Sequence, residues 1–266
     1  MTPLCLYLRY AEASLRAQLQ YRSSSMALAV SQLILTTSEF VAIWALFQRF
    51  DSIGGYGIRH VAVLYGMAGA SFAICEIFGR GFDGFSVQIL SGDFDRMLLR
   101  PRGTTFQIMA SELHLGRTGR LLQALVVLAW GLSGLELSWT FGHACLLPLA
   151  ILGGACLFLG LFVVHATLAF FTTQGLEIMN TVTYGGVETA HFPLSIYEDW
   201  FQRFFTFIVP LACLNYFPAQ ILFGASAPHP SPAWLGWVSP LAGPVFLALS
   251  SQVWKVGVRH YCSTGA

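Results

Sequence analysis

Charged residues are scarce in this chain. Aspartate, glutamate, lysine and arginine make up only 10% of its 266 residues, whereas 55% are hydrophobic. A soluble globular domain carries about 25% charged residues. A chain with so few charges cannot cover a water-facing surface, and we therefore expect an integral membrane protein. The net charge of +1 gives no indication of a nucleic-acid partner, and none is expected.

Lysine is nearly absent, and the motifs that bind nucleotides or cleave bonds are missing. The single lysine, Lys255, is followed by Val256, so the chain has no GxxxxGK[ST] loop to cradle a nucleotide phosphate. It also has no HExxH and no GxSxG motif, and its aspartates fall at or beyond the ends of the apolar runs. We therefore expect no catalytic residues, no cofactor in this chain and no enzymatic activity of its own.

The cysteines and histidines form no recognisable site. The six cysteines are scattered without a CxxC pair, and the seven histidines show no close ligand spacing. Neither a disulfide framework nor a zinc site is indicated, and we predict no metal. The cysteines are interpreted as small packing residues.

What the chain has instead is long apolar runs. A helix that crosses a bilayer needs roughly 20 mainly apolar residues. Six such runs are present, and their continuity favours helices over the alternating segments of a β-barrel. We expect an all-α membrane protein with six transmembrane helices in one domain, residues 1–266, because no segment is long enough to hold a soluble core. The predicted spans are 25–47, 58–78, 119–137, 143–171, 200–216 and 239–258.

The placement of arginine predicts the orientation of these spans. With six spans both termini lie on one side, and 12 of the 14 basic residues fall there, Arg203 at the start of the predicted fifth span among them. Only Arg49 and Arg59 fall on the other side. Cytoplasmic loops carry the excess of lysine and arginine. Both termini and the 79–118 loop are therefore predicted to be cytoplasmic, in a multi-pass protein of the inner (cytoplasmic) membrane.

The first 22 residues are amphipathic and do not resemble a cleavable signal peptide. Four leucines share one helical face, opposite a polar face. The two sets are Leu4, Leu8, Leu15 and Leu19, and Arg9, Glu12, Arg16 and Gln20. We interpret this segment as an interfacial helix on the cytoplasmic leaflet. Direct continuation into the first span is the alternative, against which the serines at 23–25 favour a bend.

Prolines and tryptophans concentrate between the last two predicted spans. Residues 210–240 hold six prolines and two tryptophans. Two short re-entrant helices, at 217–224 and 231–237, could enter the outer leaflet there and turn back, since tryptophan favours the membrane interface. An ordinary surface loop is the alternative.

Two carboxylates, Glu39 and Glu76, are interpreted as intramembrane residues. An ionisable group at membrane depth is by default a candidate functional residue. Glu39 could line a translocation path, and Phe204 and Phe205 could line its apolar part, with plain packing as the alternative for all three. Glu76 has Arg80 four residues later, and an i,i+4 pair would account for it.

The most polar stretch between spans is Gly92–Arg102, hereafter the polar island. It cannot lie in hydrocarbon, so it marks a loop between the second and third spans. Its run SGDFDRMLLRP resembles the GDxDxxLLRP element of ABC-2 type transporter permeases, in a six-span subfamily once classed as a domain of unknown function. The blocks FPLSIY, IVP and YFPA between residues 192 and 219 and the tail 254–265 also resemble that subfamily, although Val258 and Cys262 depart from its pattern.

The resemblance implies a function. Such permeases pair as two subunits, in a homodimer or a sister-chain heterodimer, with separate ATPase subunits that bind ATP and Mg, and they export drugs, lipids, peptides or polysaccharides. Short cytoplasmic coupling helices of the permease fit grooves on the ATPase. The polar island would be such a coupling helix between spans 2 and 3. Its ATPase contacts would come from Asp93, Asp95, Arg96, Arg100 and Arg102. For the three arginines, anchoring to anionic lipid head groups is the alternative.

Two other classes compete with the permease. An ion-driven secondary transporter would favour inverted repeats and several buried charges, whereas no repeat is visible and Glu39 alone lies well inside a span. A non-transporting membrane scaffold is the second alternative. Homodimer and heterodimer both stay open, because the small residues Gly153, Gly154 and Gly160 could pack helices within or between chains.

Overall fold

The computed structural model describes residues 12–262, except 17, 19, 21, 136, 138, 173, 174, 225, 226 and 230, and gives only the backbone of 175 and 176. Over this described part, the regular elements are all helices, and the only strand-like pairing is a bridge between Ile53 and Tyr56. The prediction of an all-α protein is confirmed.

Among the described residues, six helices of 16 or more residues form the body of the molecule. They are α2 (Arg22–Phe47), α3 (Ile58–Asp83), α7 (Thr118–Ser133), α8 (Phe141–Leu168), α9 (Gly175–Ala190) and α13 (Ala242–His260). Shorter helices connect them. These are α4 (Phe85–Leu90), α5 (Asp93–Leu98), α6 (Thr104–Ser111), η1 (Leu115–Arg117), η2 (Leu194–Ile196), α10 (Asp199–Arg203), η3 (Phe204–Ile208), η4 (Leu211–Cys213), α11 (Tyr216–Phe223), α12 (Ala233–Val238) and η6 (Ser239–Leu241).

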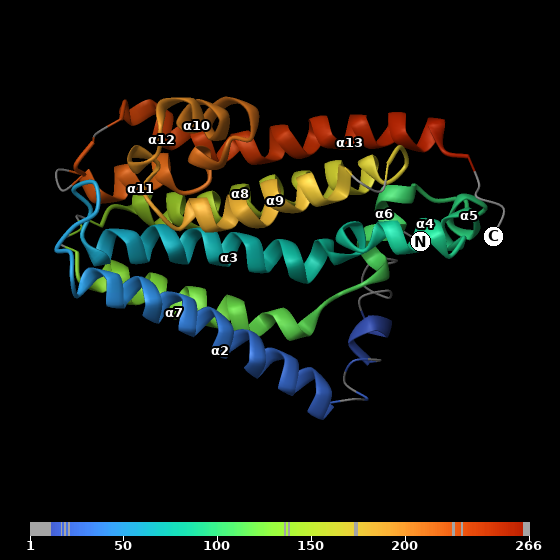
Figure 1. Ribbon diagram of the computed structural model, residues 1–266, viewed down its shortest axis with the longest axis horizontal. Helices are drawn as coiled ribbons and strands as arrows, with labels where there is room; N and C mark the ends of the chain where they lie inside the picture. Colours follow the sequence, from blue (N-terminus) through green and yellow to red (C-terminus); the bar gives the residue numbers. More distant parts are fainter. Residues whose placement is uncertain are drawn as a thin grey trace.

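The long helices run side by side along one axis (Figure 1). At one end, hereafter the island end, lie α4, α5, α6 and the close of α13. At the other, hereafter the far end, lie residues 48–57 together with α11 and α12. The polar island is thus set apart from the apolar body.

Helix α3 forms the centre of the bundle. Its most apolar window is 89% buried, whereas that of α2 is only 6% buried. A helix as apolar as α2 that lies on the outside of a bundle needs an apolar surrounding, which lipid supplies. The burial pattern therefore fits a bundle whose outer helices face a membrane.

Small residues bring α8 and α13 into close contact. Gly153 and Gly243 face each other so closely that a Cβ on Gly243 would overlap the carbonyl group of Gly153. Gly160 accommodates the ring of Phe246, and Gly154 lies against Ser71 of α3. These three glycines of α8 therefore pack helices within one chain, which decides between the two roles that the sequence left open.

Within the described residues, four helical runs are long and apolar enough to cross a membrane. They are Arg22–Phe47, Ile58–Leu90, Phe141–Leu168 and Ala233–His260. A bent pair of helices brings the candidates in the described part of the chain to at most five. Helix α7 coincides with the predicted third span, but its 16 residues reach only about 24 Å, against roughly 30 Å of hydrocarbon.

The predicted fifth span, 200–216, is not one continuous helix. The chain forms Asp199–Ile208, breaks, and resumes as Leu211–Phe223 at an angle of 73°. The break falls at Pro210, which has no N–H to continue a helix and disfavours helical geometry in the residue before it. Val209 is accordingly extended, with φ −116° and ψ 92°, and the turn before it is a π-helix.

Helix α9 occupies a stretch in which the sequence predicted no element. It lies along the bundle, packed against α3 and α8 (Figure 1). Its polar residues Glu177, Asn180 and Glu188 and its paired glycines 185 and 186 interrupt the apolar run. Those interruptions hide the helix from a search for apolar stretches.

The two short helices predicted near the far end are present. Helices α11 and α12 fall close to the predicted 217–224 and 231–237, although α12 continues through η6 into α13 as part of one long apolar run. Entry into a leaflet stays a prediction for both.

The N-terminal segment is helical over residues 12–16 and is tied to the loop after α6. Ser14 Oγ accepts a hydrogen bond from the Leu113 N–H at 3.3 Å, and Gln18 Oε1 accepts one from the Leu115 N–H at 3.0 Å. Leu4, Leu8, Arg9 and Leu19 lie outside the described residues. The interfacial position of this helix stays a prediction.

Candidate coupling site

Three short helices carry the polar island. Gly92, which follows Ser91 at the end of α4, is left-handed, with φ 71°, and precedes α5. Glycine adopts this conformation at little cost, which is why it stands at this sharp turn. Gln107 of α6 then donates to the carbonyl oxygens of Met97 (3.0 Å) and Arg102 (3.1 Å), closing the loop between α5 and α6.

Aromatic side chains fasten the island to the bundle. Phe85 of α4 and Phe94 of α5 are fully buried, with ring centroids 5.0 Å apart. Both lie against Trp254 of α13, at 4.9 and 6.3 Å, and the Trp254 indole N–H donates to Thr104 Oγ1 at 3.1 Å. This cluster joins α4, α5 and α6 to α13, so the island is anchored to the bundle.

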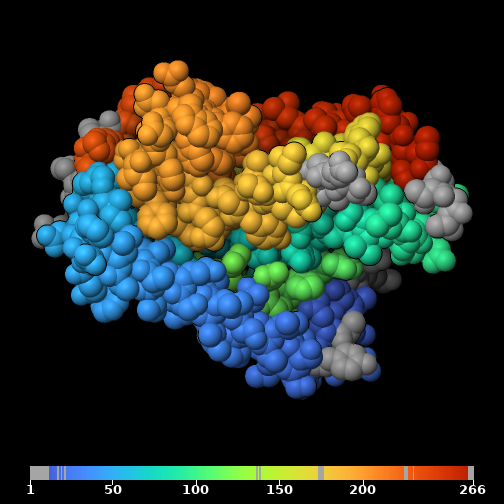
Figure 2. All heavy atoms as spheres, viewed as in Figure 1, coloured from blue at the N-terminus to red at the C-terminus, as the bar shows by residue number. Residues whose placement is uncertain are grey.

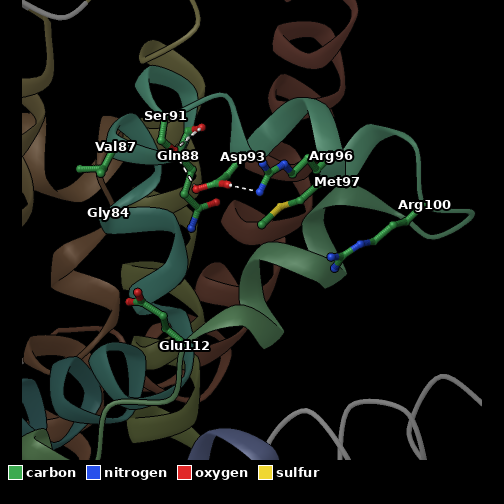
Figure 3. A pocket seen from close by; sticks show the side chains of 9 residues that line it. All are labelled: Gly84, Val87, Gln88, Ser91, Asp93, Arg96, Met97, Arg100 and Glu112. Atoms are coloured by element: carbon green, nitrogen blue, oxygen red, sulfur yellow. Dashed lines mark hydrogen bonds and ion pairs between the residues drawn. The ribbon is translucent and has the colours of Figure 1, made fainter. Parts of the chain in front are cut away.

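A cavity of about 520 Å³ opens on the polar side of the island. Figure 3 labels the residues that line it: Gly84, Val87, Gln88, Ser91, Asp93, Arg96, Met97, Arg100 and Glu112. Asp93 accepts a hydrogen bond from Ser91 Oγ at 2.8 Å and pairs with Arg96 at 3.5 Å. The side chains of Asp93 and Arg96 are 52% and 82% exposed, so this pair adds little stability and its charges stay available to a partner.

The structure brings together three of the five residues predicted for ATPase contact. Asp93, Arg96 and Arg100 line the cavity. Asp95 is half-buried on the same helix, and Arg102 is exposed beyond it. Glu112, which the sequence did not single out, completes the wall from the loop after α6.

Of the residues predicted for a translocation path, Glu39 lies on α2, whereas Phe204 and Phe205 lie on η3. Glu39 is half-buried on α2. Phe205 is buried in the core beside Phe201 and Phe204, with ring centroids 4.6 and 4.9 Å away. Phe204 is partly buried against the same core.

Behind the island, a buried cluster of charges joins three elements. The Glu76 side chain of α3 is fully buried, and its carboxylate lies 3.3 Å from Arg117 Nε and 3.2 Å from Arg120 Nη1. Arg80, the partner that spacing predicted, is farther away at 4.0 Å. Arg80 instead pairs with Asp83 at 2.5 Å, and Asp83 accepts a hydrogen bond from Tyr184 of α9 at 3.1 Å.

Sequence reasoning missed Arg117 and Arg120 as partners of Glu76. The available signal was their spacing of three residues at the start of the next helix, which puts both side chains on one helical face. A buried carboxylate needs such partners, because an uncompensated charge in an apolar interior is costly. The cluster therefore fixes the segment that follows the island onto α3.

His114 lies in the loop between α6 and η1, where its backbone N–H donates to the Ile77 carbonyl at 3.2 Å. Burial lowers the pKa of its imidazole, and the neighbouring Arg80 and Arg117 lower it further, against an opposing effect of Glu112. The neutral form is therefore favoured beside the arginine cluster.

Comparison with known proteins bears on this architecture. A family model described as ABC-2 family transporter protein matches residues 33–265, nearly the whole chain. The chain belongs to this family. No curated protein and no solved structure matches it.

Family membership makes the chain an ABC permease, a multi-pass membrane subunit of a class that works with ABC ATPases. The match includes the polar island, α4 to α6 and the aromatic residue Trp254 that fastens them. The resemblance drawn from the sequence is confirmed at the level of the family.

Proposed function

We propose that this permease is the transmembrane subunit of an ABC exporter, powered by a separate ATPase that docks on the polar island. The observation that carries the proposal is the cavity between α4, α5 and Glu112, whose exposed charges stand on helices fastened to α13. A partner bound there can pull on the bundle through Phe85 and Phe94. ATP and Mg bind the partner, because this chain has no Walker A loop.

The orientation follows from six crossings: α2, α3, α7, α8, α9 and α13. In this arrangement α9 replaces 200–216 as the fifth crossing, and the bent pair beyond it lies on the outer side. Arg203 then changes sides, which leaves 11 basic residues with the island and three opposite. The bias still favours a cytoplasmic position for the island and both termini, and we propose the inner membrane as the location of the protein.

Two permease subunits, identical or sister chains, would enclose the translocation path. Glu39 is proposed to line that path from α2, whereas the burial of Phe205 favours a packing role for it. Export is the direction that we propose, for a cargo taken from the cytoplasm or the inner leaflet.

The docking role predicts that island variants lose the ATPase. Purification without crosslinking, with identification of every co-purifying chain, supplies the partner. Replacing Asp95 and Arg96 with Ala is expected to lower ATPase recovery about tenfold, since charged contacts at an interface centre commonly contribute this much. Membrane-stimulated ATP hydrolysis should fall in parallel.

Arg49→Ala at the far end is the matched control, because it removes an arginine from the opposite side. Full recovery and full stimulation in the island variants would refute docking. If the ATPase is recovered in full and only the stimulation of its ATP hydrolysis by anionic vesicles is lost, the arginines bind lipid head groups. If no ATPase co-purifies and the chain alone drives ion-coupled transport in liposomes, the protein is a secondary transporter. If the chain neither transports nor binds an ATPase, it is a membrane scaffold.

A further inference from the structure

An apolar groove lies between α13 and the segment that Pro210 bends. Helix α10 and η3 (orange in Figure 2) stand out from the bundle surface near the start of α13 (red). The cavity between them has a volume of about 360 Å³, and its walls include Phe207 from η3 and Val164 from α8. Ser250 of the α13 wall already donates its hydroxyl to the Phe246 carbonyl at 2.9 Å. The groove therefore suits an apolar occupant.

The groove has the length of one lipid chain. It follows α13 from Ala242 to Val253. That stretch rises about 16 Å, close to half of a hydrocarbon core of roughly 30 Å. Its rim is open, because Phe207 and Leu249 are 80% and 61% exposed. Exposed apolar surface of this kind marks a binding site for lipid or a partner.

The wall formed by α10 and η3 leads from the far end into the groove. Ile196, three residues before α10, lies against Gly54 of the far end, where a Cβ on the glycine would come within 2.8 Å of it. Phe205 of η3 lies near Gly186, about one turn back along α9. Between them, Trp200 is 69% exposed, and tryptophan favours the membrane interface. The segment thus runs from the membrane surface inward.

Three side chains along this segment have a defined order. Asp199, Arg203 and Phe207 recur every four residues, so they lie on one face of the segment. Phe207 lines the groove, and the two charged residues are exposed on the turns before it. Neither Asp199 nor Arg203 forms an ion pair within the described part of the chain. The order from the surface inward is a carboxylate, a guanidinium group and an apolar ring.

We propose that the groove binds one zwitterionic phospholipid from the leaflet at the far end. Such a lipid carries, in the same order, an ammonium group, a phosphate and an acyl chain. Arg203 would bind the phosphate, Asp199 the ammonium group, and the groove one acyl chain. An anionic phospholipid is disfavoured, because it brings no cation for Asp199 and the neighbouring Glu198, which is also exposed.

This site goes beyond the proposed function, since neither the ATPase nor the cargo takes part in it. In the proposed orientation the far end faces the outer side, so the bound lipid belongs to the outer leaflet. Binding itself does not depend on that orientation.

The test titrates the purified full-length permease with two lipids and no ATPase, and reads lipid binding from native mass spectra. Palmitoyl-oleoyl phosphatidylethanolamine and palmitoyl-oleoyl phosphatidylglycerol share their chains and differ in the ammonium group. Wild type should bind the ethanolamine lipid about tenfold more tightly. Arg203→Gln should weaken both lipids about tenfold, because both carry the phosphate. Asp199→Asn should weaken the ethanolamine lipid alone and so remove the preference.

Leu249→Trp fills the groove and should weaken both lipids about tenfold. Its matched control is Val256→Trp, which changes an exposed residue of the same helix outside the groove. Arg49→Gln, at an exposed arginine of the far end, is the control for Arg203→Gln. Both controls should bind the two lipids as wild type does.

Equal affinity of wild type for the two lipids would overturn the proposal, and so would unchanged affinity in Arg203→Gln or Leu249→Trp. Crosslinking between Cys residues placed at position 249 in two copies, without lipid binding, would also overturn it and make the groove a subunit interface. A thermal unfolding midpoint near that of wild type shows that each variant is folded, and Asp199→Asn remains informative if Leu249→Trp unfolds. Because the ATPase is absent from this assay, failure here leaves the docking result standing, and the reverse also holds.

Discussion

The carboxylate of Glu76 lies in a fully buried position and is held by arginines from two directions. Arg117 and Arg120 approach from η1 and α7, and Arg80 from the same helix. The arginines keep 17–27% of their side-chain surface, so their charges are partly hydrated while that of Glu76 is not. The stability of this cluster therefore depends most on the residue that cannot reach water.

Glu76→Gln is expected to lower the free energy of unfolding by about 3 kcal/mol, because it leaves clustered arginines without their buried partner. Chemical unfolding of the purified permease measures the change. Arg120→Gln should cost less, and the double variant should cost less than the two singles added together, since both remove one interaction. Additive costs would show that Glu76 and Arg120 do not act as a pair.

Spacing along the chain predicted a partner for Glu76, but the residue it indicated, Arg80, is the more distant of the arginines around it. The i,i+4 rule applies within a helix, and Arg80 satisfies it. Arg117 and Arg120 are some forty residues away in sequence and reach Glu76 because α7 packs on α3. His191 escaped notice for the same reason: its ring lies 4.2 Å from that of Tyr65, which comes from α3.

At the scale of elements, the short helices α4 and α5 are too brief to be stable alone. Isolated helices shorter than about 12–15 residues are marginal in water. Their order comes from Phe85 and Phe94, which lie in the aromatic cluster around Trp254. The same packing gives the polar face a fixed orientation.

Phe94→Ala is expected to release α5 from the bundle. Removing a buried phenylalanine typically costs about 3–5 kcal/mol. Hydrogen exchange should therefore rise in α4 and α5 while α8 stays protected, and ATPase recovery should fall. Leu99→Ala, which changes an 87% exposed residue at the end of α5, is the control. Uniform loss of protection in every helix would instead indicate global unfolding.

At the scale of the whole molecule, the course of the chain after α8 fixes the topology. If α9 crosses the membrane, Glu177 and Glu198 lie on opposite sides; if 200–216 crosses instead, both lie in the cytoplasm. Single-cysteine variants at the two positions distinguish these cases in intact cells. We expect an impermeant maleimide to label position 198 and to leave position 177 unlabelled until the membrane is opened. Protection of both positions would restore the fifth span predicted from sequence.

The sequence by itself determined the class of protein, the positions of α2, α3, α8 and α13, and the family. Low charge, continuous apolar runs and the polar island are local properties, which can be recognised in the sequence without knowing how the helices pack. Only the tertiary structure decided that 200–216 breaks at Pro210, that α9 joins the bundle, and that the glycines of α8 pack within one chain. It also assembled the Glu76 cluster. The physical reason is that partners for a buried charge or a polar helix come from neighbouring helices, whose identity depends on packing rather than on spacing along the chain.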